Sequence, residues 1–304
     1  MRRLSNFAIL LILISIWVVF TLVNPRFLSK GNISGLLSNV AGTLVIAIGE
    51  AFVLLSGGID LSVGHVAACA IIIALSIRNL ESGMLLLLIT LIIGTLFGLL
   101  NALVVARIGA VPFISTLATG LVGRGVAFTL TKGYALRLPS QVMQFGFESW
   151  FGLPALFIVA ALVGVIAEFL LTQSKWGRYV LLLGANENAL RLCGVNSTVV
   201  KSSVYVISGV TSSLGGFIIA TNMGAALPGV GDNVLLQAVG GVVLGGIALT
   251  GGIGSVWQGM VGVLTLASVV NGLSVWGIQW QDQLVVSGLV LLLGAKLALS
   301  YQKA

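Results

Sequence analysis

The sequence predicts an all-α protein, a polytopic bundle of transmembrane helices formed by a single domain over residues 1–304. Hydrophobic residues make up 58% of the chain and charged residues only 8%, whereas a soluble domain is about one quarter charged because its surface faces water. Long apolar runs recur along the sequence, and 40 glycines would let membrane helices approach one another closely. We therefore expect most of the exterior to face lipid.

Apolar runs long enough for about ten membrane spans follow one another along the chain. A helix needs about 20 apolar residues to cross the hydrocarbon of a bilayer. The first run is predicted to be an uncleaved helix rather than a signal peptide, because no cleavage site of small residues follows it. The predicted spans are residues 5–23, 40–56, 61–77, 83–106, 112–131, 154–172, 203–222, 234–249, 253–274 and 282–299.

Two glycine-rich turns bear on the number of spans. The apolar runs are short where they meet "SGGID" and "TGGIG", so a re-entrant element at either turn would lower the count. The sequences "LSGGI" at 55–59 and "LTGGI" at 249–253 also echo one another. Such an echo fits either an internal duplication or chance.

The positive residues in the short loops predict the orientation of the chain. Ten spans place both ends on one side, and a cytoplasmic N-terminus gives nine inner Lys and Arg residues against five outer ones. The connection 132–153 then lies outside and the connection 173–202 inside. The inner residues are Arg2, Arg3, Arg107, Lys175, Arg178, Arg191, Lys201, Lys296 and Lys303; the outer ones are Arg26, Lys30, Arg78, Lys132 and Arg137. No basic stripe forms, so the net charge of +7 does not indicate nucleic-acid binding.

A short amphipathic helix is predicted within the inner connection. The side chain of Asn186 can cap its start, Glu187 and Arg191 stand at i and i+4 in the favourable order, and Gly194 suits its end. Two turns are too short to be stable alone in water. The helix is therefore held either by its own bundle or by another protein, and one of its faces collects Ala189, Leu192 and Cys193.

The motifs of catalysis are missing from the sequence. The chain has no G-x-x-x-x-G-K-[ST] loop for nucleotide phosphates and no Cys/His cluster with metal-ligand spacing. His65 is its only histidine, which leaves a nucleophile without a base beside it. We expect a non-enzymatic chain that binds no cofactor or metal, with Cys69 and Cys193 as unpaired packing residues.

Four ionisable residues fall within or beside the predicted spans. A charge at the centre of a bilayer costs at least about 2.5 kcal/mol, so it normally faces a cavity or a partner. Glu168 lies near an inner end, where it reaches the headgroups. Asp60 is open to two interpretations, a cap for the next helix or a part of a transport pathway. Glu50 could pair with Arg124 or line that pathway, and His65 is either a buried, hydrogen-bonded side chain or a substrate ligand.

Several motifs resemble the permease subunits of ribose-type sugar ABC importers. "GRYVLLLGANENALRLCGVN" (177–196) is similar to the family pattern G-R-x(5)-G-x-N-x-x-A-x-R-L-x-G-[IV]-N. "LSGGIDLSVGHVAA" and "VVLGGIALTGGIGSVWQG" are similar to two further family motifs. The resemblance covers nearly the whole chain in order.

The resemblance implies a function for the short helix and for the polar residues. In this family a cytoplasmic helix of the permease couples an ABC ATPase to the spans, and ATP and Mg are bound by that ATPase. The coupling contacts would be Glu187, Ala189, Arg191, Leu192 and Gly194. The residues that we predict to line the pathway or gate are Glu50, Gly58, Asp60, Ser62, His65 and Arg124, of which Glu50 and His65 do not match the family pattern. A periplasmic sugar-binding protein, a second permease chain and a small sugar would be the other partners, in a bacterial inner membrane with both termini cytoplasmic.

Some positions depart from the family pattern. The family more often has an uncharged residue at Glu50 and a serine at His65, and two acids where Leu235 and Gln237 stand. These differences leave the substrate open. The alternatives are a proton-coupled secondary transporter, a membrane-embedded enzyme, and an ABC permease for a branched-chain amino acid or a nucleoside.

Overall fold

A computed structural model of the chain describes residues 2–77 and 81–303. Arg78, one of the five positive residues assigned to the outer side, lies outside the described residues. Within these residues the bundle is built from helices of six to 27 residues, with a 3-10 turn (Pro25–Leu28), a π-helical turn and four two-residue strands. The helices are α1 (Arg2–Val23), α2 (Lys30–Leu55), α3 (Val63–Leu75), α4 (Gly83–Asn101), α5 (Pro112–Thr131), α6 (Ser140–Gly146), α7 (Ala155–Gln173), α8 (Lys175–Ala185), α9 (Glu187–Leu192), α10 (Ser197–Met223), α11 (Val230–Leu244), α12 (Val256–Val275) and α13 (Trp280–Lys303).

The predicted polytopic helical bundle is confirmed. Among the described residues, six helices are long and apolar enough to cross a membrane, namely α2, α4 with the π-helical turn Ala102–Arg107 that follows it, α5, α7, α10 and α12. Shorter apolar helices at Ile9–Val23, Val63–Leu75 and Val230–Leu244 occupy three more predicted spans. The remaining prediction, 282–299, falls within α13.

The second span begins ten residues earlier than predicted, and its polar first turns have partners that explain the difference. The Ser29 hydroxyl caps α2 by accepting a hydrogen bond from the backbone N–H of Asn32. The amides of Asn32 and Asn271 exchange two hydrogen bonds, of 2.8 and 3.0 Å, between α2 and α12. A stretch that reads as a polar loop is therefore helical, because a distant helix satisfies its amide.

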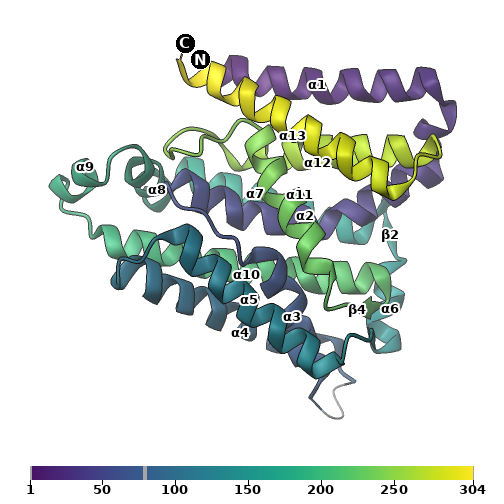
Figure 1. Cartoon of the computed structure of the whole chain (residues 1–304), viewed down its shortest axis with the longest axis horizontal. Coiled ribbons are helices and arrows are strands. Elements are labelled where there is room, and N and C mark those ends of the chain that lie inside the picture. Colours follow the sequence, from purple (N-terminus) through teal and green to yellow (C-terminus); the bar gives the residue numbers. More distant parts are fainter. Residues whose placement is uncertain (1, 78–80, 304) are drawn as a thin grey trace.

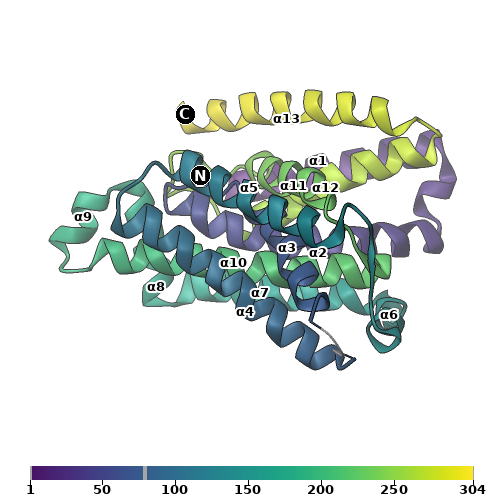
Figure 2. The same ribbon diagram turned by 60° about the horizontal axis from the view of Figure 1, so that its bottom comes forward.

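The centre of the bundle is formed by α2 and α10, which pack along one another (Figures 1 and 2). Small residues make this contact possible. A side chain at Gly215 of α10 would meet the carbonyl of Gly42 at 2.6 Å, and a side chain at Gly49 of α2 would meet the Cα atom of Ser208 at 2.8 Å. Around this pair, α3 and α4 pack on α10, while α7, α11 and α12 pack on α2.

The two glycine-rich turns contact each other in the fold. The N–H of Gly252 donates to the carbonyl of Leu55 at 2.8 Å. Gly251 has φ +86°, and a Cβ there would lie 2.7 Å from the Cα atom of Gly57 and 2.8 Å from that of Gly184. The two similar sequences, 55–59 and 249–253, therefore form turns that contact each other, and α8 packs against both.

The connection 132–153 is partly ordered. It contains α6 and the strands β1 (Leu136–Arg137) and β2 (Ser149–Trp150). β1 pairs with β4 (Ala225–Ala226), and β2 pairs with β3 (Leu153–Pro154). These pairs lie at the end of the bundle opposite α9, whereas α1 begins and α13 ends on the side of α9 (Figure 1).

Candidate functional sites

The predicted short helix is present as α9, and its ends are formed as the sequence indicated. The side-chain oxygen of Asn186 accepts from the N–H of Ala189 at 3.0 Å. Gly194 ends the segment in a left-handed conformation, with φ +77°. The predicted pair between Glu187 and Arg191 forms at 2.7 Å. Local sequence alone specifies these features.

Contacts with the bundle hold α9, which the sequence left open. The other carboxylate oxygen of Glu187 accepts from Lys201 of α10 at 3.0 Å. Partial burial by itself raises the pKa of Glu187, but hydrogen bonds from Lys201, Ser197 and Arg191 outweigh it and lower this pKa to about 2. Glu187 is therefore ionised over the physiological range. Its contribution to stability is complete above the ordinary glutamate pKa of 4.5 and is lost progressively as the pH falls from there through about 2.

One side of α9 is buried and the other is free. Leu190 is fully buried in the core, and the sequence did not predict this burial. Leu192 is 90% exposed, and its neighbours Arg191 and Cys193 are exposed as well. Cys193 is therefore wrongly predicted as a packing residue, while Cys69 is buried as expected. In both views α9 projects from the end of the bundle (Figures 1 and 2), so its outer face is available to another chain.

A polar cluster around Asp60 lies fully inside the bundle. One carboxylate oxygen of Asp60 accepts from the N–H and hydroxyl of Ser62 and from the Asn101 amide. The other accepts from the Ser208 hydroxyl of α10 at 2.8 Å. The N-cap residue of α3 is Ser62, which makes no side-chain capping bond. Asp60 thus supports the start of α3 from two residues before it and links that start to α4 and α10.

Glu50 belongs to the same cluster and does not pair with Arg124. Glu50 is fully buried in α2, and one of its oxygens accepts from the backbone N–H of Asp60 at 3.4 Å. Its other oxygen has no hydrogen-bond partner among the described residues. The alternative prediction of a Glu50–Arg124 ion pair is therefore wrong. Arg124 contacts Asp232 instead. Gly58 also adjoins this cluster, since a Cβ there would lie 2.7 Å from the hydroxyl of Tyr205, a buried residue of α10 that interacts electrostatically with Asp60 and Glu50.

A second charged group joins α3, α5 and α11. The ring nitrogen Nε2 of His65 lies 3.0 Å from one carboxylate oxygen of Asp232, and Arg124 contacts the other oxygen at 2.9 Å. His65 is buried and hydrogen-bonded, as one of its two interpretations predicted. The side chains of Arg124 and Asp232 are 42% and 47% exposed. The sequence did not identify Asp232, because Asp232 stands at the start of α11 in a stretch that reads as a loop.

The two groups are neighbours along the first turn of α3. A Cβ at Gly120 of α5 would lie 3.0 Å from Nδ1 of His65 and 3.1 Å from the Cα atom of Ser62. Nδ1 itself is buried without a partner among the described residues. The backbones of α3 and α11 also cross in contact at Gly64 and Gly231. The predicted residues Gly58, Asp60, Ser62, His65 and Arg124 are therefore gathered around one helix start.

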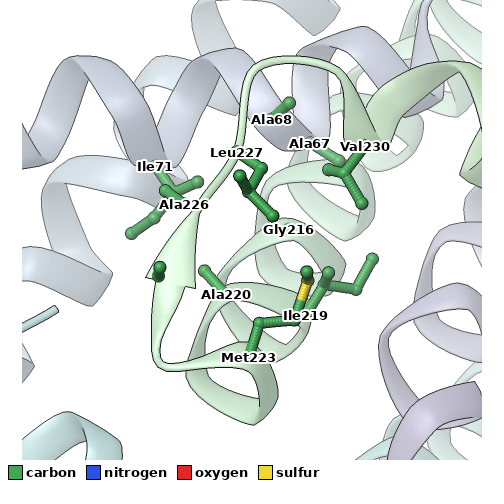
Figure 3. Close-up of a pocket in the computed structure, with 11 residues that line it drawn as sticks. Ala67, Ala68, Ile71, Gly216, Ile219, Ala220, Met223, Ala226, Leu227 and Val230 are labelled. Carbon is green, nitrogen blue, oxygen red and sulfur yellow. The ribbon is translucent and has the colours of Figure 1, made fainter. Parts of the chain in front are cut away.

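The small cavity between α3 and α10 is not suited to a sugar (Figure 3). Its volume is about 10 Å³, about enough for a single water. Its lining contains no polar side chain: Ala67, Ala68, Ile71, Gly216, Ile219, Ala220, Met223, Ala225, Ala226, Leu227 and Val230. We therefore assign no ligand to it.

Comparison with known proteins identifies the class of the chain. The family described as the permease component of the branched-chain amino acid transport system matches residues 32–295. This chain belongs to that permease family. The ribose import permease protein RbsC of Bacillus subtilis is 35% identical over 98% of this chain and 92% of its own length.

Two relatives named for other sugars cover the permease almost as fully. The L-arabinose transport system permease protein AraH of Escherichia coli is 35% identical over 96% of this chain and 89% of its own length. The D-allose transport system permease protein AlsC of Escherichia coli is 29% identical over 94% of this chain and 88% of its own length. No solved structure matches the chain at a significant level.

Proposed function

We propose that this chain is the inner-membrane permease subunit of an ABC importer for a monosaccharide. The observation that carries the proposal is the likeness to sugar permeases over more than nine tenths of the chain. The relatives are named for ribose, arabinose and allose, whereas the family description names branched-chain amino acids. Relatives matched along their length are the better guide to substrate class than the name of a broad family.

The proposed motor is a separate ABC ATPase that docks on α9. The exposed side chain of Leu192 and the exposed face of Arg191 support this docking surface, while Glu187 would hold the helix on α10 through Lys201. Ala189 and Gly194 complete the proposed contact. With the ATPase in the cytoplasm, both termini are cytoplasmic as well, and a periplasmic sugar-binding protein delivers substrate to the opposite end.

The proposed pathway runs along the face that carries Arg124 and Asp232. Arg124 is the thirteenth residue of the 20-residue α5 and lies about 18 Å along it, well inside the hydrocarbon. Half-exposed charges at that depth cannot face lipid at low cost. The face they occupy is therefore suited to a water-filled path or a second permease chain, and not to acyl chains.

The function can be tested by uptake into proteoliposomes that contain the permease, the ATPase and the binding protein encoded nearest to it. We expect ATP-dependent accumulation of at least one of ribose, arabinose and allose, insensitive to a protonophore. Leucine and uridine serve as controls. Accumulation that requires a proton gradient instead of ATP would contradict the proposal, as would uptake of leucine or uridine without any sugar.

Asp232→Asn should slow sugar uptake about tenfold, the effect of losing a single charge-assisted contact of about 1.4 kcal/mol. The amide keeps the shape of the side chain but no longer balances Arg124. Asp282→Asn, which removes an exposed acid from the first turn of α13, is the matched control. Initial uptake rates at equal amounts of assembled complex provide the measurement, and equal rates for Asp232→Asn and wild type would rule out the proposed path.

A further inference from the structure

A cavity of about 420 Å³ with charged and polar side chains in its wall lies where α7, α8 and the start of α12 meet. Its lining residues are Glu168, Leu171, Thr172, Arg178, Leu181, Gly254, Ser255 and Gln258. The close contact of α8 with the end of α7 depends on Gly177, whose missing Cβ leaves room for the carbonyl of Leu171. This contact fixes the direction in which α8 leaves α7, and with it the position of Arg178.

The wall of the cavity carries an acidic and a basic side chain, Glu168 and Arg178, that form no ion pair with each other. One carboxylate oxygen of Glu168 accepts from the N–H of Trp257 at 3.1 Å, at the start of α12. The side chain of Arg178 has no hydrogen bond or ion pair among the described residues. Because no ion pair within 4.0 Å joins Glu168 to Arg178, the cavity offers an anion-binding group and a cation-binding group at separate points of its wall.

The cavity lies at the level of lipid headgroups. α7 is a predicted membrane span that ends at Gln173, so Glu168 and Thr172 occupy its last turns. Trp257, beside Glu168, is 48% exposed, and exposed tryptophans are typical of the membrane interface. The cavity is on the α9 side of the bundle, because α8 leads directly from its wall into α9.

An apolar track continues from the cavity toward the centre of the membrane. Val165 precedes Glu168 by three residues and lies one turn away on the same side of α7. Leu162, three residues before Val165, continues this row around the helix toward the centre of the membrane. Both are exposed, as is Phe169. A lipid whose headgroup fills the cavity could therefore lay an acyl chain along α7.

We propose that this cavity binds a zwitterionic phosphoethanolamine headgroup from the leaflet on the α9 side. Arg178 donates to the phosphate, as guanidinium groups do to oxyanions, and Glu168 accepts from the primary ammonium. The half-buried carboxylate of Glu168 disfavours a purely anionic headgroup, and a quaternary ammonium has no N–H to donate to it. The bound lipid joins α7 to α8, the helix that leads into α9.

The site can be tested on the full-length permease in bilayer discs made from equal parts of phosphatidylethanolamine and phosphatidylglycerol. After mild extraction, native mass spectrometry counts the lipid that stays bound. We expect wild type to retain phosphatidylethanolamine preferentially. Arg178→Gln should lower this retention about fivefold, because it loses the charge-assisted contact to phosphate. Glu168→Gln should still hold lipid, since its oxygen can accept from Trp257, but should lose the preference between headgroups.

Lys175→Gln is the matched control, because Lys175 is an exposed cation of the same helix that does not line the cavity. Unchanged melting temperatures of the variants exclude misfolding as the cause of lipid loss. Millimolar inorganic phosphate should not displace the lipid. Displacement by phosphate, a preference for phosphatidylglycerol in wild type, or wild-type retention in Arg178→Gln would each overturn the proposal.

Discussion

Replacing Leu192 by glutamate is expected to abolish sugar uptake by preventing the ATPase from binding. Leu192 is 90% exposed and α9 is held by other residues, so the substitution leaves the fold of the chain intact. A charge introduced at the centre of a docking surface must be desolvated without a partner, which costs several kcal/mol. Co-purification of the ATPase with the permease measures the effect directly, together with ATP-dependent uptake.

Phe147→Glu is the matched control for this experiment, since Phe147 is a comparably exposed apolar residue at the opposite end of the bundle. It should leave ATPase co-purification unchanged. Arg191→Glu is expected to prevent docking too, but it is a less specific change because Arg191 also contacts Glu187 and Ser197. Wild-type ATPase binding by Leu192→Glu would exclude α9 as the docking surface.

Asp60→Ala is expected to lower the stability of the permease more than any other single polar substitution in the bundle. It would leave Ser208, Asn101 and the N–H of Ser62 without their shared acceptor. Each buried donor that loses its partner costs about 1–3 kcal/mol. The expected result is a clear drop in melting temperature and in the amount of protein in the membrane.

Asp60→Asn separates the structural role of this residue from a role in transport. The amide keeps one acceptor oxygen, so we expect assembly close to wild type, with uptake reduced about tenfold through loss of one link to α10 of roughly 1.4 kcal/mol. Ser115→Ala, which removes a hydroxyl bonded only to its own helix, should change neither quantity. Wild-type uptake by Asp60→Asn would make Asp60 purely structural, and wild-type stability of Asp60→Ala would show that the cluster does not hold the fold.

Much of α9 could be predicted because its signals are local. The Asn186 cap, the Glu187–Arg191 pair and the Gly194 stop all lie within nine residues, and each depends on backbone groups or side chains one or two turns away. The orientation of the helix could not be predicted in the same way. Burial of Leu190 and the contact of Glu187 with Lys201 depend on where α10 passes, which no local pattern specifies.

The polar residues of the spans show the same division. Their types and depths follow from the sequence, because ionisable groups stand out within apolar runs and carry a large desolvation cost. Their partners do not follow from it. Asp60 accepts a hydrogen bond from Ser208, 148 positions away, and Arg124 contacts Asp232 instead of Glu50. Helices that cross at glycines bring these distant residues together.

The sequence alone therefore determined the membrane class, the approximate spans and the short capped helix α9, since hydropathy and capping act over one helix at a time. Only the tertiary structure decided which helices touch, which charges pair and which side of α9 stays free. It also decided that α2 begins at Lys30, where Asn32 meets Asn271. These outcomes depend on packing between helices far apart in the chain. The energy of such contacts cannot be predicted from any local stretch of residues.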